Sequence, residues 1–330
     1  MERRKDLDFA KGVGIILMVL GHCYSAGNGE NILCWLYSFH MPLFFIVPGI
    51  VYGNYHRRTE RGFGSVVIKK FKRLLIPYFF FATITASFFC VLGRKSLAVF
   101  GAYMYRIVTL QGINAMWFIP CFLVVELIFA ASRRTKHHVI NNVLLALAGL
   151  TTVWLPVVKE IVPGLQSVII GSAFMALGFL CSRRYIASIS LPVWIGCTLI
   201  HLMVAMWNGR VDLAYGVYGN PILYFVNGLL GTFVIIRAYD YLSNSRLSRY
   251  IVWLGEHSIV VLCTSSMVIE ILRLADYKIA GASLPSLGDA EGIILCIFTM
   301  LIETIIILFS NKYLGYIVGK PRMLVEREQK

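Results

Sequence analysis

The chain has 330 residues, of which 58% are hydrophobic and only 15% are charged, and its mean hydropathy is +0.72. These values lie far above the range of soluble domains and exclude an ordinary water-soluble globular protein. The net charge of +14 could suggest nucleic-acid binding, but the cations gather in short segments between apolar runs, so we expect no nucleic-acid partner.

Apolar runs of about twenty residues recur along the whole chain, which predicts an all-α, polytopic integral membrane protein with about ten transmembrane helices. The first run is followed by a second full span, so we interpret it as retained rather than as a cleaved signal. We expect a single transmembrane domain over residues 1–330 without an appended soluble domain. The predicted spans are 9–27, 31–53, 74–93, 114–132, 139–157, 164–181, 189–207, 219–239, 250–273 and 291–311.

The cations are distributed asymmetrically across these spans. With a cytoplasmic N-terminus, the cytoplasmic segments collect 24 of the 31 Lys and Arg residues. This is the positive-inside pattern of membrane proteins, counted over short loops. It predicts that both termini are cytoplasmic.

Three ionisable residues lie at the mouth of the span 9–27 or within it. Asp8 and Lys11 stand three residues apart and can pair at the mouth of the helix. Lys11 and His22 share a face, with His22 about 16 Å deeper, more than halfway across the apolar core. An ionisable group at that depth is a candidate functional residue. The alternative is a structural histidine bonded to a backbone carbonyl or a hydroxyl.

The span 31–53 contains Pro42 and Pro48, which free backbone carbonyls and favour a kinked helix lining a cavity. His40 lies in an aromatic run beside a proline. A structural role is the favoured interpretation for it, and acceptor binding is the other.

The first cytoplasmic loop, 54–72, is strongly basic. Its cations suit topology and anionic lipid headgroups, or a phosphate site where Lys69, Lys70, Lys72 and Arg73 enter the membrane. Lys70 and Arg73 share a helix face, and no Gly-rich phosphate loop is present, so side-chain cations would hold the phosphates. The same run continues to Tyr78, which we include among the candidate donor-binding residues.

The span 114–132 has an aromatic exoplasmic end and a buried acid. Trp117 is either an interfacial belt residue or part of an acceptor site. Glu126 lies within the apolar run and requires a partner, for which Lys11, Arg73 and His22 are the candidates.

The exoplasmic loop 208–220 is polar and aromatic. Asn208 and Asp212 could take sugar hydroxyls while the tyrosines stack on sugar rings. Turn chemistry explains the same composition equally well.

Eight cysteines occur singly, without metal-ligand spacing, so neither a metal site nor a disulfide framework is expected. Glu256, His257 and Glu303 are polar residues at or within the last two spans, to which the pattern assigns no chemistry. No internal repeat of helix pairs is visible, which disfavours a transporter built from two related halves.

Five motifs in order resemble the acyltransferase 3 family of integral membrane acyltransferases, closest to the branch related to fucose 4-O-acetylases. The resemblance spans the whole chain. The motifs are Asp8-x-x-Lys11-x10-His22, F-H-M-P-L-F-F-I-V-P-G (39–49), K-K-F-K-R-L-L-I-P-Y (69–78), W-F-I-P (117–120) and L-G-E-H-S (254–258).

Three departures from the family pattern are visible. Lys11 stands where the family has Arg or Lys, which is allowed. Pro48 replaces a serine, so a hydroxyl role there is lost. Residues 263–266, Cys-Thr-Ser-Ser, occupy the place of a late histidine, which leaves His22 as the expected catalytic histidine.

The resemblance implies transfer of an acyl group, most often acetyl, from cytoplasmic acyl-CoA to a hydroxyl of an exoplasmic or lipid-linked glycan. Acetyl-CoA would be a substrate, with no permanently bound cofactor, and the location would be the bacterial inner membrane. The competing hypotheses are a secondary transporter or flippase for a lipid-linked sugar or small anion, and a non-enzymatic membrane component. The candidate residues are His22 as general base with Lys11, Asp8 and Glu126; Lys69, Lys70, Arg73 and Tyr78 for the donor; and Trp117, Asn208, Asp212 and His40 for the acceptor.

Overall fold

The described part of the chain is helical, which confirms the predicted all-α class. It contains no strand, and its one isolated β-bridge joins Asp212 to Val217. The computed structural model describes residues 4–24, 28–54, 62–93, 95–154, 164–182, 188–280 and 289–319.

The helices form two compact units, each assembled from separate stretches of the chain. Unit 1 comprises the described parts of Met1–Gly21, Gly29–Glu60 and Val124–Glu256, and unit 2 those of His22–Asn28, Arg61–Leu123 and His257–Lys330. Helices α1 and α6 pass from one unit to the other. The expectation of a single transmembrane domain stays a prediction.

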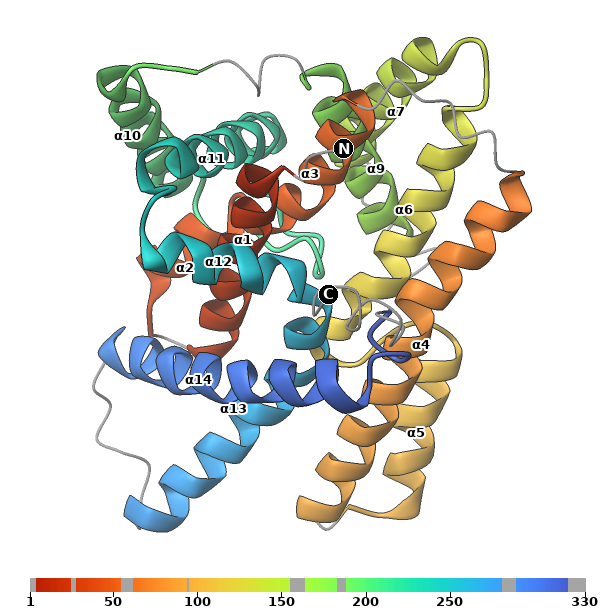
Figure 1. Cartoon of the computed structure of the whole chain (residues 1–330), viewed down its shortest axis with the longest axis vertical. Helices are drawn as coiled ribbons and strands as arrows, with labels where there is room; N and C mark the ends of the chain where they lie inside the picture. The colour runs from red at the N-terminus through yellow and green to blue at the C-terminus, as the bar shows by residue number, and fades with distance from the viewer. Residues whose placement is uncertain are drawn as a thin grey trace, which may run out of the picture. The chain divides into compact units, whose positions relative to one another are not determined.

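Figure 1 shows the elements in their chain order. Unit 1 holds most of α1 (Lys5–Cys23), α2 (Glu30–Tyr37), α3 (His40–Asn54), the later part of α6 (Phe118–Ser132), α7 (His138–Thr152), α9 (Leu165–Leu180), α10 (Leu191–Asn208), α11 (Pro221–Leu242) and α12 (Arg246–Glu256). Unit 2 holds α4 (Phe63–Leu92), α5 (Leu97–Val108), the short 3₁₀ helix η1 (Asn114–Trp117), α13 (Ser258–Ala280) and α14 (Asp289–Tyr313).

In unit 1, α3 and α9 pack backbone against backbone (Figure 1). A Cβ added to Gly49 would lie 2.1 Å from the Met175 carbonyl oxygen, and one added to Gly178 would lie 2.3 Å from that of Ile46. Small residues allow such close approach in membrane helix pairs, where van der Waals contact replaces the hydrophobic effect as the driving force. The glycine that ends the predicted motif 39–49 therefore has a packing role.

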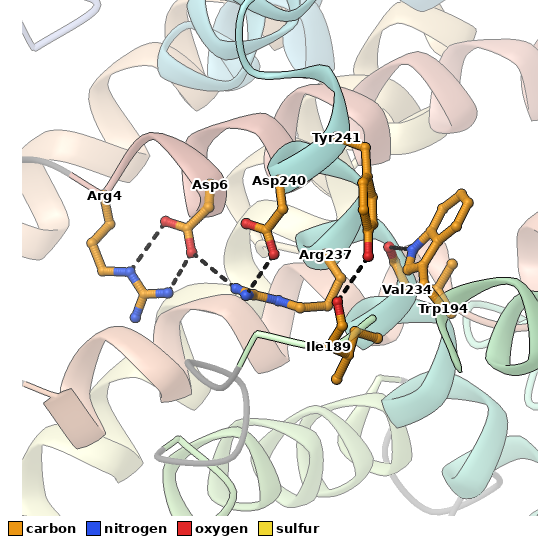
Figure 2. Close-up of polar contacts among 8 residues, drawn as sticks. All are labelled: Arg4, Asp6, Ile189, Trp194, Val234, Arg237, Asp240 and Tyr241. Carbon is orange, nitrogen blue, oxygen red and sulfur yellow. Dashed lines mark hydrogen bonds and ion pairs between the residues drawn. The ribbon is translucent and has the colours of Figure 1, made fainter. Parts of the chain in front are cut away.

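The neighbouring helices α10 and α11 of unit 1 are joined by side-chain hydrogen bonds. The Trp194 indole N–H donates to the Val234 carbonyl at 2.9 Å (Figure 2). Asn220 caps α11 by accepting from the N–H groups of Ile222 and Leu223, just before Pro221 continues into the helix. Both residues are common helix-start signals, because Asn satisfies free N–H groups and Pro needs none.

In unit 2, α4 lies side by side with α5, and α13 packs on α14 (Figure 1). Tyr78 of α4 is fully buried, and its hydroxyl donates to the Ile107 carbonyl of α5 at 3.1 Å.

Seven helical stretches in the described residues are long and apolar enough to cross a membrane. They correspond to seven of the ten predicted spans. The other three predicted spans fall on α1, whose first turns carry four charges, and on α7 and α9, which have 15 and 16 residues. The multi-pass architecture follows from the seven, and the count of ten stays a prediction.

The predicted single span 31–53 is two helices, α2 and α3, separated by Ser38 and Phe39. A continuous helix would need a Pro42 N–H to bond the Ser38 carbonyl, and proline has none. Ser38 instead donates its hydroxyl to the Trp35 carbonyl at 2.6 Å. The predicted bounds agree with the apolar stretch Glu30–Asn54, and the interruption lies within it.

The predicted span 250–273 was wrong at its start. Residues 250–256 belong to the amphipathic helix α12, and the apolar stretch is Ser258–Asp276 of α13. The buried face of α12 consists of Ser248, Ile251, Leu254 and Gly255, while its arginines are exposed. A helix with this many charges is costly in an apolar core, so the spanning part begins after it.

Candidate active site

The mouth of α1 carries the predicted ion pair. Lys11 Nζ lies 2.6 Å from Asp8 Oδ1, and the Asp8 carboxylate is buried. Helix α12 touches α1 here, because a Cβ on Gly255 would lie 1.8 Å from the Asp8 carbonyl oxygen. The glycine of the motif 254–258 thus lets the two backbones meet. The pairing is confirmed, and the role of the pair in catalysis stays a prediction.

His22 lies in the last turn of α1 and is half-buried. Its imidazole makes no hydrogen bond with any residue that the structure describes. Its backbone carbonyl accepts a hydrogen bond from Arg273 Nη2 of α13 at 3.2 Å, and the carbonyl of Cys23 accepts from the same nitrogen at 3.1 Å. The sequence pattern did not single out Arg273.

His40 and His257, in contrast, are buried and hydrogen-bonded. His40 Nδ1 donates to the Leu36 carbonyl at 2.7 Å, and the ring stands edge-on to Tyr37. His257 Nε2 lies 2.9 Å from the Asn311 amide nitrogen, which donates to it. These contacts are typical of structural histidines.

His201 belongs to a closed ring of buried hydrogen bonds in unit 1. The Trp35 indole N–H donates to His201 Nε2 at 3.1 Å, so the proton is on Nδ1, which donates to the Asn227 amide oxygen at 2.9 Å. The Asn227 amide nitrogen donates to the Ser38 hydroxyl at 2.8 Å, and that hydroxyl donates to the Trp35 carbonyl, which closes the ring. A network in which every member is satisfied fixes helices in place and leaves no group for chemistry.

The cations predicted to bind the donor lie on α4 in unit 2. Lys69 and Arg73 are exposed, Lys70 is half-buried, and all belong to one continuous helix. Among the described residues, no acid pairs with Lys69 or Arg73. The segment is therefore a local excess of positive charge, as a phosphate site requires.

Tyr78, also predicted to bind the donor, is fully buried and uses its hydroxyl to hold α5. This contact gives it a structural function. Its part in donor binding stays a prediction. The buried position and the bond to Ile107 do not favour that role.

Trp117 ends η1 and is half-buried in unit 2. The turn before it is tight: Gly112 has φ +73°, and a Cβ there would lie 2.4 Å from the Trp117 Cα. Asn114 also adopts a left-handed backbone with φ +47°. Non-glycine residues in this region cost free energy and are concentrated at functional sites, so the turn is consistent with a built site around Trp117.

In the loop 208–220, the polar side chains bond the loop itself. Asn208 accepts from the Asn220 N–H at 2.7 Å and donates to the Tyr218 carbonyl at 3.1 Å. Asp212 accepts from the Ala214 N–H at 2.9 Å. Burial raises the pKa of the Asp212 carboxyl above its ordinary value, while hydrogen bonds from the N–H groups of Ala214 and Tyr215 act in the opposite direction. The turn interpretation therefore has direct contacts, and acceptor binding by Asn208 and Asp212 stays a prediction.

Glu126 has a partner that the sequence did not suggest. The Tyr52 hydroxyl donates to Glu126 Oε2 at 3.0 Å, and the Arg133 guanidinium lies over the Tyr52 ring at 5.2 Å. All three residues belong to unit 1. Tyr52 lies two residues before the basic loop 54–72 and resembles an ordinary interfacial tyrosine, which is why it was missed.

A second charged group in unit 1 joins α1 to α11 (Figure 2). Arg4 pairs with Asp6, Arg237 lies 3.7 Å from the same carboxylate, and Arg237 Nη1 donates to Asp240 at 2.8 Å. Two carboxylates neutralise two guanidinium groups, so the group is a structural clamp and offers no excess charge to an anion. The described residues also contain no group of three or more His, Cys, Asp or Glu placed to hold a metal ion.

Comparison with known proteins decides the family. The Acyl_transf_3 family model, described as an acyltransferase domain, matches residues 4–309. The chain belongs to this acyltransferase 3 family. Nodulation protein NolL of Sinorhizobium fredii (strain NBRC 101917 / NGR234) is 27% identical over 197 residues, covering 53% of this chain and 48% of that protein. No solved structure gave a significant match.

The chain thus spans about half the length of the curated relative that it matches. Family membership confirms the resemblance carried by the five motifs and, together with the apolar helices, identifies a multi-pass membrane protein of the acyltransferase 3 family. It favours the enzyme over the transporter and the non-enzymatic component.

Proposed function

We propose that this acyltransferase is an O-acetyltransferase that moves an acetyl group from cytoplasmic acetyl-CoA to a hydroxyl of an exoplasmic or lipid-linked glycan. Family membership supports acyl transfer. A thioester is already activated, so the protein has to supply a base, positioning and stabilisation of the oxyanion. Longer acyl-CoA donors would undergo the same chemistry.

The observation that carries the proposal is that the His22 ring is not engaged in a hydrogen bond with a described residue. Of the histidines in or at the ends of apolar helices, His40, His201 and His257 are hydrogen-bonded through their rings, and His138, at the start of α7, stands edge-on to the Phe179 ring. The ring of His22 has no such partner among the described residues. A general base must keep a lone pair available for the substrate proton, and a free imidazole at a helix end meets that condition.

In the proposed reaction, His22 takes the proton of the acceptor hydroxyl as its oxygen attacks the thioester carbonyl. A C–O bond forms, and the carbonyl becomes a tetrahedral oxyanion. The C–S bond then breaks, and the protonated imidazole returns its proton to the leaving thiolate of CoA. His22 is neutral again, and no covalent acyl-enzyme is required.

The α4 cations would bind the donor. CoA carries several phosphates, and the charge excess at Lys69, Lys70 and Arg73 is complementary to them. Lys11 and Asp8 would order the mouth of α1 rather than move protons. Glu126 stays a candidate catalytic residue, and the hydrogen bond from the Tyr52 hydroxyl would hold its carboxylate.

For the acceptor, we propose Trp117 as the residue best suited to stack on a sugar ring, because its indole is partly exposed beside a tight turn. Asn208, Asp212 and His40 are weaker candidates, because loop and helix contacts already engage their polar atoms.

The test uses the full-length protein in lipid nanodiscs with labelled acetyl-CoA and the lipid and glycan fraction of the native membrane as acceptor. General-base catalysis contributes about 10²–10⁴-fold, so His22→Ala should lower label transfer by that factor. His22→Gln keeps a polar group without a useful base and should be nearly as inactive. His137→Ala, a histidine exposed on a loop, is the matched control and should keep wild-type activity.

Near-full activity of His22→Ala, in a folded and inserted protein, would remove His22 from the mechanism. Failure of the wild-type protein to bind acetyl-CoA would contradict the proposal that acetyl-CoA is the donor. Label retained on the protein after incubation with donor alone would replace direct transfer by an acyl-histidine mechanism.

A further inference from the structure

Arg273 joins two segments that lie about 250 residues apart in the sequence. It projects from α13, and its Nη2 donates to the carbonyls of both His22 and Cys23, the last two residues of α1. Both partners belong to unit 2. The last carbonyls of a helix lack partners within the helix, and a cation at that end also complements the helix dipole.

This contact matters because little else orients the His22 ring. The imidazole has no hydrogen bond to a described residue, so its position follows from the backbone of the last helical turn and from packing. A base placed about 1 Å from its productive position can cost on the order of 100-fold in rate.

Helix α14, which belongs to unit 2 like the end of α1, packs against the last turn of α1. Cys23, next to His22, is buried, and its thiol interacts with that of Cys296. A Cβ on Gly292 would lie 2.6 Å from the Tyr24 ring, so α14 approaches the chain directly after α1. Packing by α14 and hydrogen bonding by Arg273 together fix the end of α1.

We propose that Arg273 is a positioning residue for the acyl transfer: by capping the two terminal carbonyls of α1, its guanidinium holds the His22 imidazole where it can take the acceptor proton. The inference rests on the proposed function. Arg273 acts through His22 and does not itself touch the reacting atoms.

The first arm of the test is kinetic. Arg273→Met, which keeps the length and loses the donors, should lower kcat by roughly ten- to a hundred-fold while KM for acetyl-CoA is unchanged. Arg273→Lys can still donate to two carbonyls and should recover a large part of the activity. Arg106→Met removes an exposed arginine of the same unit and is the matched control.

The second arm measures the chemical reactivity of the His22 ring and does not depend on enzyme activity. The intact nanodisc protein is treated with diethyl pyrocarbonate, and the acylation rates of individual histidines are followed by mass spectrometry. In Arg273→Met the turn loosens, so His22 should be modified at least several-fold faster than in the wild type, while His137 is modified at an unchanged rate.

A loss of activity in Arg273→Met that only follows the loss of folded protein, with unchanged His22 reactivity, would overturn the proposal. Equal activity of Arg273→Met and wild type would overturn it as well. If the wild type proves inactive with acetyl-CoA but His22 reactivity still depends on Arg273, the proposed function fails while the positioning contact stands.

Discussion

At the scale of single residues, Gly49 lies where α3 crosses α9 too closely for any side chain. The Met175 carbonyl occupies the place of a Cβ at a separation of 2.1 Å. The crossing cannot relax by a side-chain rotation, because the opposing atom belongs to the backbone. The same residue type at Gly196 of α10 has nothing within 4 Å of the Cβ position.

We therefore expect Gly49→Ala and Gly196→Ala to have opposite effects. Overpacking of this kind costs about 1–3 kcal/mol, so Gly49→Ala should lower the thermal unfolding temperature and the yield of monodisperse protein. Gly196→Ala gains helix propensity of about 1 kcal/mol and should leave both unchanged or slightly improved. Thermal unfolding in detergent measures both variants. Equal melting temperatures for the two would show that α3 and α9 are not in backbone contact.

At the scale of elements, α4 combines two functions along one helix. Its first turns carry the cations, and its apolar part carries Tyr78, which fixes α5. Because the helix begins at Phe63, eleven residues before the predicted span, the cations sit on a regular helix rather than in a loop. Lys70 and Arg73 therefore keep a fixed spacing on one face.

We expect Lys70→Gln/Arg73→Gln to raise KM for acetyl-CoA by roughly ten-fold or more, with a smaller effect at high salt because exposed charges are screened. Arg246→Gln/Arg249→Gln on α12 removes the same charge at the same spacing from another exposed face and should leave the donor kinetics unchanged. Initial rates at varied acetyl-CoA and ionic strength separate the two. Unchanged donor kinetics in the α4 variant would reduce its cations to topology alone.

At the scale of the whole molecule, two units are each assembled from distant parts of the chain. Unit 2 contains His22, Trp117 and the α4 cations, so the proposed base, one acceptor candidate and the proposed donor-binding residues belong to one unit. The proposed membrane orientation places both termini on the cytoplasmic side of a bacterial inner membrane. That orientation rests on the distribution of Lys and Arg in the sequence.

Cysteine labelling in intact cells tests the orientation. A membrane-impermeant maleimide should label Tyr215→Cys, whose side chain is highly exposed on the loop 208–220, from outside. Lys136→Cys, exposed on the link between α6 and α7, should react only after the membrane is permeabilised. The wild type, with its native cysteines, gives the background. Labelling of Lys136→Cys from outside, without Tyr215→Cys, would invert the scheme.

Much of the architecture could be predicted because the bilayer imposes strong local constraints. Run length and hydropathy placed most helices, and residue spacing predicted the Asp8–Lys11 pair, since both depend on neighbours along one helix. The wrong start of the span 250–273 has a local cause, because α12 is amphipathic and a hydropathy window blends it with α13. The break between α2 and α3 is also local, because Pro42 has no N–H to bond the Ser38 carbonyl.

The sequence by itself determined the helical membrane class, the family motifs and the candidacy of His22. Only the tertiary structure decided which polar groups are committed elsewhere. Trp35, Ser38 and Asn227 satisfy His201, Tyr52 pairs with Glu126, and Arg273 reaches the end of α1. These contacts join residues far apart in the chain, and no periodicity reports them. Hydrogen bonding depends on distances of about 3 Å, which are set by how helices pack rather than by any one helix.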